Sequence, residues 1–306
     1  MTTPQNQISA NIFKTWLIMF LFSVFVVGVV YIMAMGLGYD AVGSLGLVGM
    51  SFILAGVMNF VSYYFSDKMV LSISAAKEIK KIDHPQLFRS VENLSIAAGL
   101  PMPRVYIIND SAPNAFATGR DPQHSAVAFT SGILDKLNKQ EIEGVVAHEL
   151  SHINNRDTLL MTVVSILVGL IALLADWFIR ITWYGNRDSE DNRSNALFFA
   201  VALLAAILAP IIGTLIQLAI SRRREFLADA SGAYLTRDPE QLAYALQKIA
   251  QDREPLEVAN KATAHLYIMN PLKGQKDAIG WFAGLFLTHP PVEARVKALM
   301  SMEGQI

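Results

Sequence analysis

Long apolar runs dominate the hydrophobic pattern of this chain. Four stretches are apolar over the length of about 20 residues that a helix needs to cross a hydrocarbon core of about 30 Å. They lie at about 13–36, 42–65, 159–183 and 196–220. The pattern therefore predicts a mainly α-helical membrane protein with four transmembrane helices in two hairpins, formed by residues 1–65 and 159–220.

The residues between the two hairpins predict folded protein outside the membrane. Residues 66–158 carry helical apolar spacing at 86–98 and a strand pattern at Arg104–Ile108. The run that starts at Asn114 predicts two short strands joined by a Gly-Arg-Asp-Pro turn. We therefore expect one part of an α+β domain with a small β-sheet here.

The second part of this domain follows the fourth apolar stretch, in residues 221–306. It contains a helical pattern at 221–250 and a short helix at 290–302. Basic residues follow each hairpin: Lys68, Lys77, Lys80, Lys81 and Arg89 after the first, and Arg222, Arg223 and Arg224 after the second. The positive-inside rule therefore places both parts of the domain in the cytoplasm.

Composition supports partial burial in lipid. Of 306 residues, 53% are hydrophobic and 17% charged, with a mean hydropathy of +0.36, which is too apolar for a protein that must cover itself with polar surface. The net charge of -1 creates no field that would attract nucleic acid. The chain has no cysteine, which excludes disulfides, thiolate catalysis and cysteine metal sites.

The main candidate for chemistry is the run His148-Glu149-Leu150-Ser151-His152 in a predicted helix that Asn138 and Glu141 cap. Residues four apart share a helix face, so both imidazoles can bind one cation. Glu149 is rotated from His148 by about 100°, which places its carboxylate beside the metal, within reach of a bound water. This pattern indicates a zinc hydrolase in which Glu149 is the general base.

A catalytic zinc ion takes three protein ligands, so one more is needed. The remaining histidines could each serve in principle: His84, His124, His265 and His289. Glu225 is the better candidate, because the second hairpin returns it to the membrane face where His152 lies. Asp229 follows four residues later on the same helix face. Its carboxylate can accept the other ring N–H of a ligating histidine, most simply His148.

The motifs together resemble those of the HtpX-type membrane metalloproteases and, more distantly, the CAAX prenyl proteases. They are NAFATG at 114–119, HELSH at 148–152, RRREFLADA at 222–230, and THPP at 288–291 with Arg295. The resemblance implies a zincin-like domain of the gluzincin type with one Zn²⁺ per chain. It implies that His148, His152 and Glu225 bind zinc, that Glu149 is the base, and that Asp229 supports a ligand.

The resemblance also implies roles that spacing alone does not assign. His289 would help to stabilise the tetrahedral oxyanion, and Arg295 would support that wall of the site. An edge strand would bind extended substrate through backbone pairing, over Asn114, Ala115, Phe116 and Ala117.

These expectations define a membrane-bound zinc endopeptidase. It would cleave membrane or misfolded proteins at the cytoplasmic face of a bacterial inner membrane, and kinship suggests quality control under stress. Its partners would be the bilayer and protein or peptide substrates. Two alternatives stay open: a metal-regulated transporter, and a catalytically inactive membrane scaffold. Few polar residues lie within the apolar stretches, which disfavours the transporter.

Overall fold

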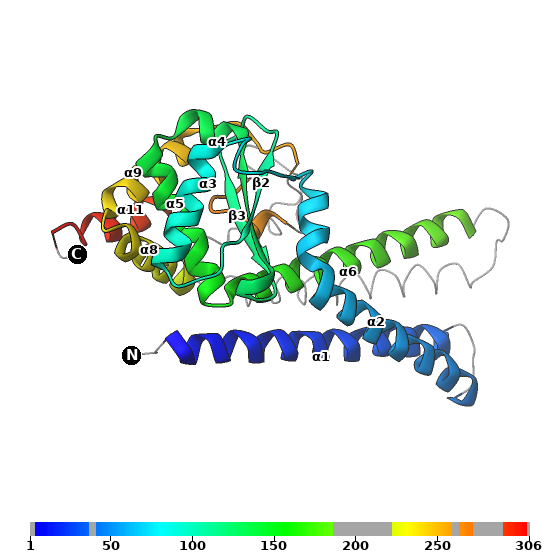
Figure 1. Cartoon of the computed structure of the whole chain (residues 1–306). Helices are drawn as coiled ribbons and strands as arrows, with labels where there is room; N and C mark the ends of the chain where they lie inside the picture. Colours follow the sequence, from blue (N-terminus) through cyan, green and yellow to red (C-terminus); the bar gives the residue numbers. More distant parts are fainter. Residues whose placement is uncertain (1–3, 37–40, 186–221, 259–262, 272–289, 305–306) are drawn as a thin grey trace.

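The computed structural model describes residues 4–36, 41–185, 222–258, 263–271 and 290–304. Among these residues the molecule is mostly helical and carries a small mixed sheet. Figure 1 shows one folded domain with three long helices, α1, α2 and α6, running along one side of it.

Two of the long helices are candidate membrane spans. Helix α1 (Pro4–Gly36) and helix α2 (Ala41–Ile73) cover the first two predicted spans. Within them, Ile8–Tyr31 and Leu45–Ile73 are long and apolar enough to cross a bilayer. Large apolar side chains on both helices face outward, among them Phe13, Phe20, Met50, Phe52 and Ile53. Such exposure suits contact with lipid.

Helix α6 (Asp157–Gly185) covers the third predicted span. Its described side chains, up to Ile171, are mostly apolar and mostly buried against α1, α2 and the domain. The fourth predicted span, at 196–220, lies outside the described residues. The four-span arrangement therefore stays a prediction.

The three long helices pack against one another around an apolar seam. Phe22 of α1 and Leu160 and Leu167 of α6 are buried in it. The Asn59 side chain of α2 donates hydrogen bonds to the Met19 carbonyl, at 3.0 Å, and to the hydroxyl of Ser23, at 2.8 Å. Side-chain amides hold membrane helices together in this way because lipid offers them no partner.

The described sheet has four strands in the order β1-β2-β4-β3. These are β1 (Lys77–Glu78), β2 (Arg104–Ile108), β3 (Ala115–Gly119) and β4 (Ser125–Thr130). Strands β2 and β4 are parallel, whereas β3 runs antiparallel to β4 and forms one edge. The predicted strands are thus present, and the predicted turn contains a 3-10 helix, η1 (Pro122–His124), capped by Asp121. The two-residue β1 was not predicted.

Helices cover the sheet on the side that carries the candidate chemistry. They are α3 (Pro85–Ala97), α4 (Ser131–Lys136), α5 (Lys139–Asn154), α8 (Arg222–Thr236), α9 (Pro239–Gln251) and α11 (Val292–Met300), with a 3-10 turn, η2 (Ala264–Leu266). Helix α5 lies at the centre and packs against α3, α8, α9 and β3. Its N-terminus has the predicted capping box: Asn138 accepts from the Glu141 N–H, and the Glu141 carboxylate accepts from the Asn138 N–H.

The helical pattern predicted at 221–250 is present, but as two separate helices, α8 and α9. The break lies at Arg237, whose φ of 56° is left-handed, and at Asp238, which caps α9. The apolar spacing on the two sides of the break is helical in both, so the pattern alone did not separate them. The turn lets α8 and α9 both pack on α5.

Two glycines allow the close packing on α5. A Cβ built on Gly232 of α8 would lie 3.0 Å from the backbone nitrogen of His148, and one on Gly144 of α5 would lie 3.0 Å from the Cα of Leu242 in α9. Backbone atoms cannot rotate away as a side chain can. Any larger residue at these positions therefore pushes a neighbouring helix outward.

We expect Gly232→Ala to lower the free energy of unfolding by about 1–3 kcal/mol, the usual range for overpacking. A denaturant titration of the purified protein in detergent measures this change. The matched control is Gly49→Ala in α2, where a Cβ meets nothing within 4 Å. Equal stability of Gly232→Ala and Gly49→Ala would contradict the close contact between α8 and α5.

Candidate metal centre

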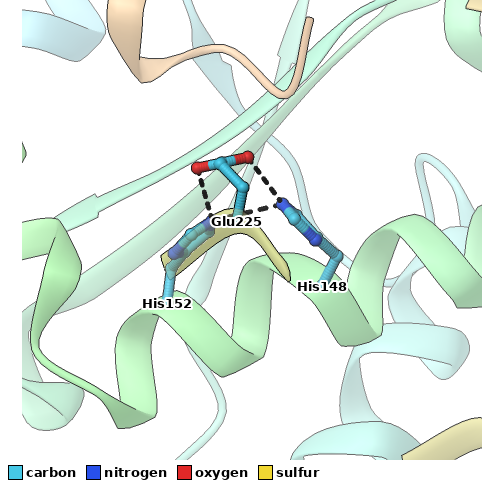
Figure 2. A group of neighbouring side chains, drawn as sticks. All are labelled: His148, His152 and Glu225. Carbon is cyan, nitrogen blue, oxygen red and sulfur yellow. Dashed lines mark hydrogen bonds and ion pairs between the residues drawn. The ribbon is translucent and has the colours of Figure 1, made fainter. Parts of the chain in front are cut away.

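Helix α5 presents two histidines to one point in the domain. His148 and His152 are one turn apart, with ring centroids 4.7 Å apart and ring planes at 88°. Their Nε2 atoms are 3.1 Å apart, and both side chains are buried. The predicted shared face is therefore present, with the two ring nitrogens directed at each other (Figure 2).

Glu225 completes the group from the first turn of α8. Figure 2 shows its carboxylate lying across both rings. One oxygen, Oε2, is 3.8 Å from His148 Nε2, and the other, Oε1, is 3.7 Å from His152 Nε2. Among the described residues, these three side chains form the one group of His, Cys, Asp or Glu whose donor atoms all lie within 4.8 Å of one another.

This donor set fits a divalent metal ion. A tetrahedral zinc site with bonds of about 2.0–2.1 Å separates its ligand atoms by about 3.3 Å. The observed separations of 3.1, 3.7 and 3.8 Å bracket that value. Two imidazoles and one carboxylate also suit several other divalent ions. The geometry therefore supports a metal centre without selecting the metal.

His148 is held from behind by a carboxylate. Its Nδ1 is 2.9 Å from Oδ1 of Asp229, the partner that the sequence predicts. Asp229 in turn accepts two hydrogen bonds from Arg295, at 2.7 and 2.6 Å. Burial alone would raise the pKa of Asp229, but the Arg295 guanidinium outweighs it and holds that pKa below its usual value. Asp229 is therefore a fixed anion beside the ring.

Arg295 is fully buried and reaches beyond Asp229. Its Nη1 lies 3.5 Å from Glu225 Oε2 and donates to the Ile268 carbonyl at 3.1 Å. The structure thus places Arg295 behind the candidate ligands. His289, which was predicted to stabilise the oxyanion with support from Arg295, lies outside the described residues.

His152 also has a carboxylate beside its Nδ1, from Asp157, a residue that the sequence did not predict for the site. Asp157, at the start of α6, places Oδ2 3.1 Å from His152 Nδ1. Burial lowers the pKa of His152, but Asp157 and Glu225 outweigh it and raise that pKa to about 9. The sequence feature that could have identified Asp157 is its position as an acidic residue directly before an apolar stretch. A cation bound by His152 would compete with a proton for the ring nitrogen.

Glu149 follows His148 in α5, lies near the candidate ligands His152 and Glu225, and is 1% exposed. Burial raises the pKa of its carboxyl to about 7, although His152 and Arg295 oppose the shift and the Ala117 backbone N–H donates to it. A carboxyl with a pKa near neutrality can both take and return a proton. The structure thus buries Glu149 near the candidate ligands, and its role as general base stays a prediction.

The predicted substrate strand is the edge strand β3, and the chain itself already contacts part of it. Asn114 donates to the Met269 carbonyl at 3.0 Å, and the Ala115 carbonyl accepts from the Ile268 N–H at 2.9 Å. The Phe116 ring packs edge-on against Tyr267, with centroids 5.0 Å apart. Of the predicted run, Ala117 is the residue that contacts Glu149.

Three of the four other candidate histidines, those within the described residues, lie away from this group. His84 and His124 are exposed, and His124 pairs with Asp121. His265 is buried, with Nε2 3.1 Å from the hydroxyl of Ser165 and 3.2 Å from the Met161 carbonyl. The structure thus brings Glu225, rather than any of these three, to the histidine pair.

Relatives with curated descriptions match nearly the whole chain. A "Protease HtpX homolog" from Dictyoglomus thermophilum is 44% identical over 302 residues, which cover 98% of this chain and 95% of the relative. One from Tropheryma whipplei is 44% identical over 97% of this chain and 98% of the relative. One from Pyrococcus furiosus is 47% identical over 86% of this chain and 89% of the relative.

A solved structure and a family profile also match. The crystal structure of S. mikatae Ste24p aligns with a TM-score of 0.49 at 18% identity, over 81% of this chain and 57% of that one. Residues 81–303 match the profile of peptidase family M48. This match covers the histidine pair, Glu225 and their supporting carboxylates. The chain belongs to peptidase family M48 and resembles its HtpX-type members along almost its full length.

Proposed function

We propose that this membrane metalloprotease is a zinc-dependent endopeptidase whose metal is held by His148, His152 and Glu225. The observation that carries the proposal is the convergence of these side chains, from two helices far apart in sequence, on one buried point. Glu149 lies nearby, and burial raises the pKa of its carboxyl to about 7. Membership of a peptidase family supports the same reaction.

The residues divide the chemistry of peptide hydrolysis between them. A bound zinc ion would supply a Lewis acid and lower the pKa of a water molecule to about 7. Glu149 would accept the proton of the attacking water and then pass it to the leaving amine. Asp229 and Asp157 would keep the ring orientations of His148 and His152 fixed.

Substrate would approach along the edge strand. We place the extended peptide beside Ala117, because this residue contacts the proposed base. Asn114, Ala115 and Phe116 would then act by holding the segment around Ile268 in place. For the oxyanion, His289 stays the proposed donor on resemblance alone, with Arg295 as its support.

The substrates are proposed to be membrane proteins or their unfolded cytoplasmic segments. Helix α6 begins at Asp157, five residues after His152, so the metal centre lies next to a helix of the membrane bundle. A metal centre in this position would be close to polypeptide segments that leave the bilayer. Kinship with HtpX homologues supports a role in quality control under stress, at a bacterial inner membrane.

Replacing the proposed base tests the mechanism. Glu149→Gln should keep metal bound while it slows cleavage of a membrane-protein substrate by about 10²–10⁴-fold, because the amide cannot accept the proton. Metal analysis and a cleavage assay on the purified variant measure both effects. Undiminished turnover would remove Glu149 from this role. A wild-type chain that binds metal but cleaves nothing would favour the scaffold or transporter alternatives.

Removing the third ligand tests the metal centre itself. Glu225→Ala should reduce bound zinc from about one ion per chain to well below one, because two ligands do not complete the site. Glu293→Ala, at an exposed glutamate of α11, is the control and should keep full occupancy. Full occupancy in Glu225→Ala would exclude Glu225 as a ligand.

Cysteine labelling tests the proposed cytoplasmic location, and the natural chain has no cysteine to interfere. Gln140 is exposed in the first turn of α5. Gln140→Cys should resist a membrane-impermeant thiol reagent in intact cells and react after the cells are opened. Ser189→Cys, in the predicted outer connection, should react in intact cells. The reverse pattern would place the active site outside.

A further inference from the structure

The carboxylate of Asp157 connects the candidate metal centre to the membrane helices. Its Oδ2 lies 3.1 Å from Nδ1 of His152. Its Oδ1 accepts a hydrogen bond from Nδ2 of Asn11 at 2.8 Å and lies 3.4 Å from Nη1 of Arg224. One oxygen thus faces the ligand, and the other is held by two donors. Whatever fixes Oδ1 also fixes the orientation of Oδ2 toward the ring.

Asn11 is a polar residue inside a candidate membrane span. It belongs to α1, within the apolar stretch Ile8–Tyr31, and is 3% exposed. Its amide also donates to the Asn155 carbonyl at 3.0 Å. Both hydrogens of the side-chain amide are therefore used, one at Asn155, which caps the C-terminus of α5, and one at Asp157, which starts α6.

This arrangement ties three elements together at one amide. Asn155 follows directly on the helix that carries His148 and His152, and Asp157 begins the third long helix. A buried amide in an apolar segment is costly unless its hydrogen bonds are made. The contact therefore favours one position of α1 relative to the metal ligands.

We propose that Asn11 is a positioning residue of the metal centre, which acts on His152 through Asp157. Groups that hold the second nitrogen of a ligating histidine orient its ring and strengthen metal binding. Helix α1 then helps to orient a metal ligand, in addition to anchoring the chain in the membrane. This inference rests on the proposed function, since it takes His152 to be a metal ligand.

Asn59 provides a matched control in the same bundle. Its amide also makes two hydrogen bonds between membrane helices, to the Met19 carbonyl and the Ser23 hydroxyl of α1. Neither acceptor contacts the candidate ligands or Asp157 by any hydrogen bond of the described residues. Losing the Asn59 amide therefore disturbs helix packing but leaves the link between Asn11, Asp157 and His152 intact.

The test compares metal affinity in Asn11→Leu and Asn59→Leu. Leucine keeps the branched shape and the number of heavy atoms of the side chain and suits a membrane helix, but it is larger and donates no hydrogen bond. The full chain is purified in detergent, stripped of metal and titrated with Zn²⁺ against a chelating dye. We expect Asn11→Leu to weaken Zn²⁺ binding by about tenfold or more, the range seen for groups that support metal ligands. Asn59→Leu should stay within about twofold of the wild type.

Replacing zinc with cobalt provides a second measurement, the visible absorption of bound Co²⁺, which general destabilisation of the fold would not change. The visible absorption of Co²⁺ bound to Asn11→Leu should differ from that of the wild type, because His152 is less firmly oriented. Asn11→Gln, which keeps an amide donor, should bind Zn²⁺ more tightly than Asn11→Leu. This variant also keeps the comparison informative if Asn11→Leu folds poorly.

A double variant tests whether Asn11 acts on His152 through Asp157. If Asn11 acts through Asp157, adding Asn11→Leu to Asp157→Asn should weaken binding little further, because coupled residues are not additive. Unchanged affinity in Asn11→Leu, equal loss in Asn59→Leu, or full additivity would each overturn the inference while the proposed function stands. A wild-type chain that binds no Zn²⁺ would overturn both.

Discussion

The structure depends on one physical constraint: two imidazoles and a carboxylate are buried within 4.8 Å of one another. A divalent ion at their centre would bind all three at once. Without it, the Arg295 guanidinium beside Glu225 and Asp229 offsets part of the negative charge of the site, and Asp157 and Glu225 raise the pKa of His152. The surrounding fold is arranged to hold these donors in place. The capped N-terminus fixes α5, and Gly232 lets α8 approach it closely.

Each histidine is backed by its own carboxylate, and each carboxylate connects to a different part of the chain. Asp229 leads to Arg295 of α11 and, through its guanidinium, to the segment that pairs with β3. Asp157 leads to Asn11 of α1. The same three ligands are thereby tied to the edge strand on one side and to the membrane bundle on the other. The proposed metal centre, the edge strand and the membrane helices are thus connected by one network of hydrogen bonds and ion pairs.

Local patterns predicted the parts of the site that depend on helix periodicity. The spacing of His148 and His152 and the cap at Asn138 follow from one turn of helix, and Glu225 lies at the pair as the sequence predicted. Contacts between distant segments were not predictable in this way. The bond from Asn11 to Asp157 joins residues 146 positions apart, and the pairing of Ile268 with Ala115 joins segments of no distinctive composition. The break at Arg237 was missed because both sides have helical spacing.

The most direct test of the account is the location of the metal by anomalous diffraction at the zinc absorption edge, from crystals of the full zinc-loaded chain. We predict one peak per chain, at about 2.0–2.2 Å from the Nε2 atoms of His148 and His152 and from a carboxylate oxygen of Glu225. A zinc peak at any other group of side chains, or a coordination sphere that leaves Glu225 out, would contradict it.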